Sequence, residues 1–164
     1  MNRNKNLSAV FDCMIFLQAA ISEKSPAAEI FRQVERDNVL LFVGDEILAE
    51  VREVLNRPKI LAKNPHLTIE YVEAFLSRVL KKAKLIKKIP KRFEYPRDPK
   101  DEKYINLAVE AKADYIVSRD NDLLDLMTGT DIESKEFRQR FRPLKIIEPL
   151  EFLKIIQEDS SLIQ

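Results

Sequence analysis

The chain has 164 residues, of which 45% are hydrophobic and 34% are charged, with 28 lysines and arginines against 27 aspartates and glutamates. This size and composition fit one folded domain, and the near-neutral charge gives no overall attraction to nucleic acid or to membranes. With two glycines, one histidine and one cysteine, the chain cannot form a glycine-rich phosphate loop, a zinc site with nitrogen and sulfur ligands, or an internal disulfide.

These scarcities also bear on location. The single cysteine suits a reducing compartment, and no apolar run approaches the ~20 residues that span a bilayer. Residues Met1–Lys5 form no hydrophobic signal core. We therefore expect a cytoplasmic protein without a membrane partner.

The first half of the chain alternates apolar runs with helix starts. Residues 7–11 predict a buried strand. Ser25-Pro26 is typical of a helix start, because serine caps a helix and proline fits its first position. Residues 39–43 predict a second strand, and Asp45 is expected to cap the next helix, which ends before Pro58.

The second half begins with a longer helix from Thr68. Six residues are expected to form its inward face: Ile69, Val72, Leu76, Val79, Leu80 and Ala83. Residues 85–89 predict a short strand, and Asp98-Pro99 begins a helix that continues to about Lys112. The remaining expected elements are a strand over 115–117, a short helix over 120–127, a strand over 144–147 and a closing helix over about 149–158.

Strands that alternate with helices predict a single α/β domain over residues 1–164, with a mainly parallel sheet flanked by helices and a core over about 7–150. In such sheets, ligands bind at the carboxyl ends of the strands. Acids that follow strands or open the helices at that edge are therefore the candidates for a site. They are Asp12, Glu46, Glu50, Glu53, Asp98, Asp101, Asp120 and Asp122.

Carboxylates gathered at one edge repel one another, so a cation is expected among them. Mg²⁺ and Mn²⁺ prefer oxygen ligands and stabilise the displacement at a phosphodiester. A structural interpretation stands beside this one, because Asp98 and Asp120 could be N-caps, and Asp101 and Asp122 could be acids that favour a helix dipole. Asp12 is harder to explain, since burying an acid without a partner is costly. Helical geometry does not choose among the three glutamates.

Four segments carry a resemblance to a known family: Val10–Asp12, Ile47–Pro58, Asp98–Tyr104 and Ala113–Leu124. They resemble the PIN domain and, more narrowly, its branch of VapC-like toxins from toxin–antitoxin pairs. The similarity covers roughly Leu7–Leu150, and the stretch from Asp98 to Leu124 is its most specific part.

The resemblance implies a metal-dependent ribonuclease. The family's four acids fall on Asp12, Glu50, Asp101 and Asp120, with Asp122 as an auxiliary ligand and Ser118 at the family's serine or threonine position. In that interpretation the carboxylates bind one or two Mg²⁺ or Mn²⁺ ions, and a water activated by the metal cleaves RNA to leave 5′-phosphate and 3′-hydroxyl ends. The resemblance also implies a homodimer and an antitoxin protein as partner.

One position departs from the family pattern. The family usually follows its first acid with Thr-Asn, whereas this chain has Cys13-Met14, and methionine lacks an amide to hydrogen-bond near a metal. A catalytically silent PIN-like module that binds RNA or protein is therefore the alternative hypothesis. Cys13 itself is expected to pack as a small hydrophobe. Receiver domains and haloacid-dehalogenase-type phosphatases fit poorly, because Asp12-Cys13-Met14 offers neither paired acids nor Asp-x-Asp.

A basic stretch from Arg78 to Arg92 contains eight lysines and arginines and no acid. Its candidate RNA-binding residues are Lys81, Lys82, Lys84, Lys87 and Lys88. Such a stretch can bind a phosphate backbone, but it can equally be a solvated helix end. The same two interpretations apply to a second basic stretch, residues 138–142.

Overall fold

The computed structural model describes residues 7–163, with side chains described as far as residue 159. The strands are β1 (Leu7–Phe11), β2 (Val39–Gly44), β3 (Lys84–Ile86), β4 (Tyr115–Val117) and β5 (Lys145–Ile147). The α-helices are α1 (Cys13–Ile21), α2 (Pro26–Glu35), α3 (Asp45–Leu55), α4 (Pro58–Lys63), α5 (Ile69–Lys82), α6 (Glu102–Ala111), α7 (Asn121–Leu124), α8 (Ile132–Arg140) and α9 (Pro149–Ile163). Two 3₁₀ turns are η1 (Pro99–Asp101) and η2 (Asp125–Met127). The start of the chain, where we expect no signal core, lies outside these residues.

The five strands form one sheet in the order β3-β2-β1-β4-β5, and every pairing in it is parallel. The predicted α/β fold with a mainly parallel sheet is confirmed. From β1 the chain builds toward β2 and β3, then crosses to β4 and β5 on the other side. The strand order therefore reverses between β1 and β4, which is where ligands bind in open parallel sheets.

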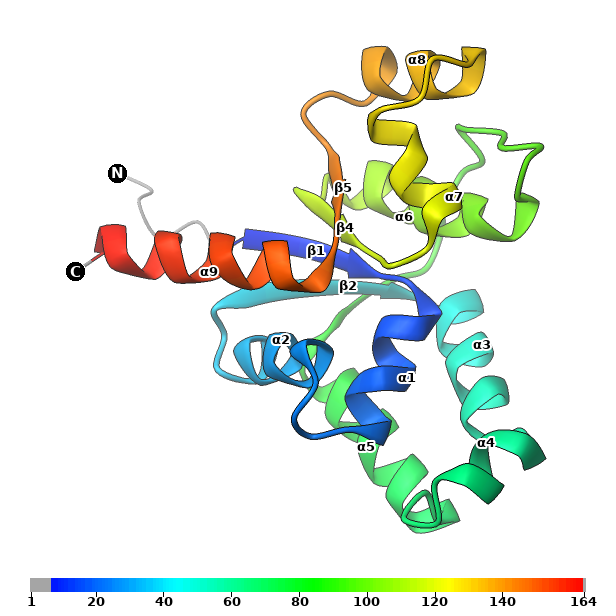
Figure 1. Ribbon diagram of the computed structural model, residues 1–164, viewed down its shortest axis with the longest axis vertical. Coiled ribbons are helices and arrows are strands. Elements are labelled where there is room, and N and C mark those ends of the chain that lie inside the picture. The colour runs from blue at the N-terminus through cyan, green and yellow to red at the C-terminus, as the bar shows by residue number, and fades with distance from the viewer. Residues whose placement is uncertain (1–6, 164) are drawn as a thin grey trace.

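The core lies on both faces of the central strand. Ala9, Val10 and Phe11 of β1 are all at most 1% exposed, as expected for a strand buried on both faces. Helix α6 covers one face of the sheet, while α2 and α9 pack together on the other (Figure 1). Within residues 7–163, no helix combines the length and apolar character needed to cross a membrane.

Some of the predicted helix starts are present and one is wrong. Ser25 caps α2 by accepting from the amide of Ala28 at 3.1 Å, and Thr68 caps α5 by accepting from the amide of Tyr71 at 3.0 Å. Asp45 does not cap α3, because the cap position belongs to Gly44 and Asp45 is already the first helical residue. An acid there still favours the helix dipole.

Three helices were absent from the sequence prediction: α1, α4 and α8. Helix α1 follows β1 after a single residue and is apolar along nearly all of its length, so a helical period is not visible in it. Helix α3 ends at Leu55, before Pro58 as predicted, and Pro58 itself begins α4, at a position where proline is favoured. The inward face of α5 is also partly wrong, since Ile69 is 74% exposed and Leu80 is 49% exposed.

The predicted ends of two strands shift slightly. Strand β3 ends at Ile86, three residues earlier than the predicted 85–89 run, and β5 begins at Lys145. The lysines at 87 and 88 therefore lie in the loop that follows the carboxyl end of β3. The closing helix α9 starts at Pro149 as predicted and continues to Ile163.

Candidate metal centre

Asp12 lies between β1 and α1 and is only 4% exposed. One of its carboxylate oxygens accepts a hydrogen bond from the amide of Ile15 at 3.1 Å, which makes Asp12 the N-cap of α1. Its backbone amide donates to the carbonyl of Val117, the last residue of β4, at 3.2 Å. The main chain therefore holds this acid at the reversal point between β1 and β4.

Ser118 connects Asp12 to the segment after β4. The serine is fully buried and its hydroxyl donates to Oδ2 of Asp12. The same hydroxyl oxygen accepts from the backbone amide of Asp120 at 2.9 Å. The carboxylate of Asp120 in turn accepts from the amide of Asp122 at 2.9 Å and caps α7, as the structural interpretation of this residue predicts. A single hydroxyl thus links the first acid to the turn that bears two others.

Asp98 and Asp101 enter the site from η1, the 3₁₀ turn that precedes α6. Both occupy cap positions, but neither makes a side-chain capping hydrogen bond. The N-cap interpretation of Asp98 therefore holds for its position and fails for its side chain. Asp101 is only 6% exposed, and its Oδ2 is buried without a hydrogen-bond partner among the described residues.

Four carboxylates gather at this point, from η1 and from the start of α7. Each of Asp98, Asp101, Asp120 and Asp122 offers an oxygen, and these oxygens all lie within 4.8 Å of one another. The set contains only oxygen donors, which suits hard divalent ions such as Mg²⁺ and Mn²⁺. The unpartnered oxygen of Asp101 is the strongest sign of fit, because a buried carboxylate oxygen needs a partner.

The pKa values of the buried acids reflect this crowding. Burial, assisted by the charge of Asp120, raises the pKa of Asp12 from 3.8 to about 6, although the hydrogen bonds from Ser118 and Ile15 oppose the rise. Burial and then the charge of Asp120 raise the pKa of Asp101 to about 8. Burial also raises the pKa of Asp98, together with its contact with Asp122. A bound cation would relieve this repulsion.

Glu50 stands apart from the group of four. Its Oε1 accepts a 2.5 Å hydrogen bond from the hydroxyl of Tyr104 and lies 3.3 Å from Nζ of Lys103. The Tyr104 oxygen also accepts from the backbone amide of Cys13 at 3.0 Å. Glu50 is therefore held next to the residue that follows Asp12, with a lysine already beside it. Of the predicted acids, Asp12 and Glu50 flank the group, while Asp101, Asp120 and Asp122 belong to it.

Arg97 contacts the outer side of the group. Its guanidinium lies 2.7 Å from the carboxylate of Asp122 and 2.7 Å from that of Asp125. Tyr95 is buried, and its hydroxyl donates to the backbone carbonyl of Asp122 at 2.5 Å. Asp122 is thus partly neutralised and fixed in place, whereas the described ion pairs include none with Asp98, Asp101 or Asp120.

Sequence reasoning missed the parts that Tyr104 and Arg97 play at this edge, and it left Asp98 undecided between a site residue and a helix cap. Asp98 was visible as an acid three residues before Asp101, but its position before a proline favours the capping interpretation. Tyr104 reads as an apolar core residue of its helix, and it is indeed buried, but its hydroxyl joins α6 to α1 and α3. No local signal separates that use of a tyrosine from plain packing.

Cys13 packs as expected, with a buried side chain. Burial, and then the charges of Glu50 and Asp12, raise the pKa of its thiol to about 12. A thiol with so high a pKa stays protonated and is a poor nucleophile. Met14, which stands at the family's asparagine position, is 52% exposed.

Several cations of the basic stretch are paired with acids, which its sequence does not indicate. Four of its eight cations are in ion pairs: Arg78 with Glu35, Lys82 with Asp37, Lys91 with Glu94 and Glu102, and Arg92 with Glu110. Lys81, Lys84, Lys87 and Lys88 are exposed and have no ion pair to the described residues. In the second stretch, Arg138 donates to the carbonyls of Leu126 and Gly129, and Arg140 pairs with Glu136.

Comparison with known proteins covers most of the sheet and the group of four acids. No curated protein matches the chain. Among protein families, the PIN domain matches residues 8–122, which is more than two thirds of the chain and runs from β1 to Asp122. The matched region contains both strands of the reversal point and all four acids of the clustered group. The chain therefore belongs to the PIN-domain family.

Proposed function

We propose that the protein is an endoribonuclease that depends on Mg²⁺ or Mn²⁺ and hydrolyses RNA phosphodiester bonds. PIN domains are generally metal-dependent nucleases, so membership of the family supports a function of the nuclease type. The observation that carries the proposal is the buried Oδ2 of Asp101, which has no partner among the described residues and belongs to a group of four carboxylates. Such a group, with only oxygen donors, suits a hard divalent cation.

The residues of the chain have distinct parts in this proposal. Asp101, Asp120 and Asp122, joined by Asp98, would hold the ion. Asp12, oriented by the hydroxyl of Ser118, would complete the binding site from β1. When bound, the ion would supply positive charge to stabilise the phosphodiester oxygens during displacement.

Glu50 is proposed as a catalytic residue at the edge of this centre. Tyr104 and Lys103 fix its carboxylate, and the same tyrosine hydroxyl binds the amide of Cys13. With Tyr104 and Lys103 beside it, the carboxylate is positioned to contact a ligand of the metal centre. Because Glu50 lies outside the group of four, it would contribute to catalysis from α3.

The exposed lysines are the proposed contacts to the RNA backbone. Lys87 and Lys88 lie just after β3, at the carboxyl edge of the sheet where the acids also lie. Lys81, Lys82 and Lys84 lie at the end of α5 and the start of β3. Because Lys82 is already paired with Asp37, we expect it to contribute less than the others.

We also propose that the protein acts as the toxin of a toxin–antitoxin pair, as a cytoplasmic homodimer inhibited by an antitoxin protein. This part rests on the resemblance of the motif segments to the VapC-like branch. A neighbouring small gene that encodes a DNA-binding protein would support it. Co-purification of that gene's product with this protein, and loss of ribonuclease activity in the complex, is the test.

The competing function is a catalytically silent module that binds RNA or protein. The exposed Met14 favours it, because no amide is available at that position to orient a ligand of the metal. The two functions share a fold and differ in turnover, so a cleavage assay separates them.

The assay measures cleavage of single-stranded RNA by purified protein with Mg²⁺ or Mn²⁺. We expect cleavage that a chelator stops and that Asp12→Asn or Asp101→Asn reduces at least about 100-fold, as for other electrostatic contacts at active sites. Asp159→Asn, a change near the end of α9, is the matched control and should retain activity. Equal residual cleavage in all four proteins would mean contamination, and metal binding without cleavage would favour the silent module.

A further inference from the structure

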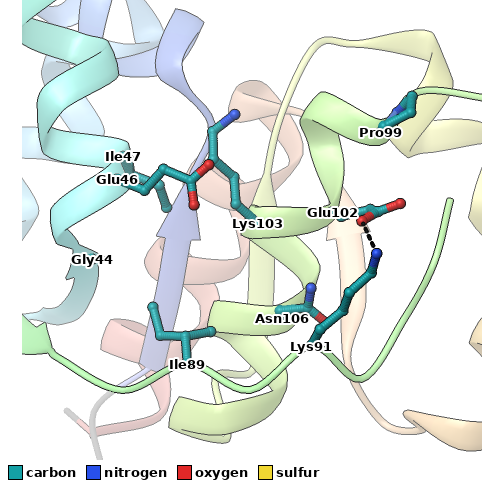
Figure 2. Close-up of a pocket in the computed structure, with 9 residues that line it drawn as sticks. All are labelled: Gly44, Glu46, Ile47, Ile89, Lys91, Pro99, Glu102, Lys103 and Asn106. Atoms are coloured by element: carbon teal, nitrogen blue, oxygen red, sulfur yellow. Dashed lines mark ion pairs between the residues drawn. The ribbon is translucent and has the colours of Figure 1, made fainter.

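A pocket of about 250 Å³ opens beside the metal centre, between α3, the start of α6 and the loop after β3. Figure 2 shows the nine residues that line it. Two of them, Pro99 and Glu102, lie on either side of the acid Asp101 in the chain, and Lys103 pairs with Glu50. The pocket therefore lies next to the segments that bear Asp101 and Glu50.

One wall of the pocket is apolar and closely packed. Ile47 of α3 is buried, Ile89 lies in the loop after β3, and Gly44 ends β2 between them. A Cβ on Gly44 would lie only 2.8 Å from Cδ1 of Ile89, so a side chain at this position would displace the isoleucine. Pro99 adds a further apolar surface. Such surfaces suit the face of a flat ring.

The polar groups of the pocket have balanced charges. Glu46 and Glu102 are set against Lys91 and Lys103, and Lys91 lies 3.5 Å from Glu102. The amide oxygen of Asn106 accepts from the backbone amides of Arg92 and Phe93 at 2.9 and 3.0 Å. Its amide nitrogen is left as a donor and points into the pocket (Figure 2).

We infer that this pocket binds a nucleobase of the RNA strand next to the phosphate held at the metal centre. The inference rests on the proposed ribonuclease function and names the part of the substrate that the enzyme recognises. A phosphate fits less well, because both lysines of the pocket are already paired with carboxylates, Lys91 with Glu102 and Lys103 with Glu50. A neutral ring with hydrogen-bonding groups on its edge matches both the apolar wall and the balanced charges.

The arrangement also selects among the bases. Glu46 offers a hydrogen-bond acceptor, whereas Asn106 and Lys103 offer donors. Every base edge carries donors and acceptors, but guanine alone presents two adjacent donors, N1–H and its amino group, beside a carbonyl acceptor. One carboxylate can accept from both donors, so Glu46 together with the donors of Asn106 and Lys103 favours guanine. The pocket volume is slightly below the ~300–1,000 Å³ of whole-ligand sites, as expected for one base of a longer strand.

The test maps cleavage sites in a pool of random single-stranded RNA with the full chain and Mn²⁺. The wild type should cut preferentially beside guanine. Ile89→Trp fills the pocket, so it should lose this preference and raise KM at least about tenfold. Glu46→Gln changes an exposed side chain with little effect on folding, and it should weaken the preference by removing the charged acceptor.

Two controls separate base recognition from folding and from metal binding. Ile132→Trp makes the same change at an exposed position of α8 and should keep the wild-type preference and KM. The rise in melting temperature with Mn²⁺ should be equal in the wild type, Ile89→Trp and Glu46→Gln, because the pocket supplies none of the four clustered acids.

The outcomes distinguish the two proposals. If the wild type cuts RNA without base preference, or if both pocket variants retain the preference, base recognition here is wrong and the nuclease proposal stands. If the wild type binds Mn²⁺ but never cuts RNA, the nuclease proposal is wrong and base recognition fails with it. Loss of preference in both variants with unchanged Mn²⁺ shifts supports the pocket.

Discussion

Asp101 is the residue whose protonation should most affect the stability of the metal-free protein. Its pKa is about 8 in the folded state, and that of Asp12 is about 6, against an ordinary value of 3.8 for both. The folded protein therefore binds more protons at these sites than the unfolded chain does. Their contribution to stability is complete below about pH 4 and is lost as the pH rises through 6 and 8.

Because the folded state binds more protons, the wild type should lose stability relative to Asp101→Asn as the pH is raised from 5 to 8.5. This prediction applies in the presence of a chelator. At the upper end the variant should be the more stable by about 1–2 kcal/mol, a size common for substitutions that relieve strain at functional sites. Thermal melts of both proteins across the pH range measure this. A constant difference across the range would mean that Asp101 is not held protonated by its surroundings.

Protons and metal ions compete for the same carboxylates, so Mn²⁺ should stabilise the wild type more at pH 8 than at pH 5.5. This consequence connects the raised pKa values to the proposed function. Asp98 shares in it, because its pKa is raised by burial and by contact with Asp122. The sequence placed Asp98 among the candidate acids but could not separate a site role from a cap, since the residue before a proline is typical of a turn or cap.

Among the elements, the joint between α6, α1 and α3 depends on one hydroxyl group. Tyr104 is buried, and its oxygen accepts from the amide of Cys13 while donating to Glu50. Tyr104→Phe leaves a buried amide and a carboxylate without that partner. We predict a loss of about 1–2 kcal/mol in the free energy of unfolding, together with a lower kcat because Glu50 is no longer fixed.

Tyr71→Phe is the matched control for this substitution. The Tyr71 hydroxyl donates to the carbonyl of Ala20 at 3.1 Å and joins α5 to α1 away from the acids. Removing it should cost similar stability and leave kcat unchanged. If denaturant melts and cleavage rates show the same kcat for both variants, the Tyr104 hydroxyl serves only to stabilise the fold.

The elements also show where sequence reasoning succeeds. The strands β1, β2 and β4 were predictable because a central parallel strand is a continuous apolar run with a polar end. The caps at Ser25 and Thr68 were predictable because their chemistry is local. Helix α1 was not, since Asp12 serves at once as strand end, helix cap and candidate ligand. Helix α8 was missed because it is mostly polar, so periodicity gives no signal.

At the scale of the whole molecule, positive charge must be found locally, because the net charge is only +1. The exposed Lys87 and Lys88 lie at the edge of the sheet that also bears the acids. We predict that replacing both with alanine weakens RNA binding. The negative slope of log affinity against log salt concentration should become shallower, by about 0.7 for each phosphate that the variant no longer neutralises. Fluorescence anisotropy with a labelled single strand, at several salt concentrations, gives this slope.

The double substitution Lys135→Ala and Lys154→Ala removes the same charge from α8 and α9 and should leave the slope unchanged. If both double variants alter the slope equally, only net charge matters and the lysines after β3 form no specific contact. The sequence alone could not decide this, because it shows the cluster of cations but not their partners. The structure pairs four of the eight with acids that are distant in the chain or follow in a loop.

For the acidic site, too, the sequence shows the residues but not their partners. The sequence identified acids that follow strands, and topology brings Asp12 and Asp120 to the reversal point between β1 and β4. It could not show that Glu50 pairs with Lys103 and stands apart from the group of four. Such a distinction depends on side-chain contacts between α3 and α6, which no local pattern encodes.

The most direct measurement of the central claim is a calorimetric titration of the metal-free protein with Mn²⁺ at pH 8. The wild type should bind the ion, and Asp101→Asn should bind it at least about tenfold more weakly, because the variant lacks a ligand from the buried part of the group. Asp159→Asn should match the wild type. Equal Mn²⁺ affinity in the wild type and Asp101→Asn, or no binding by either, would contradict the account.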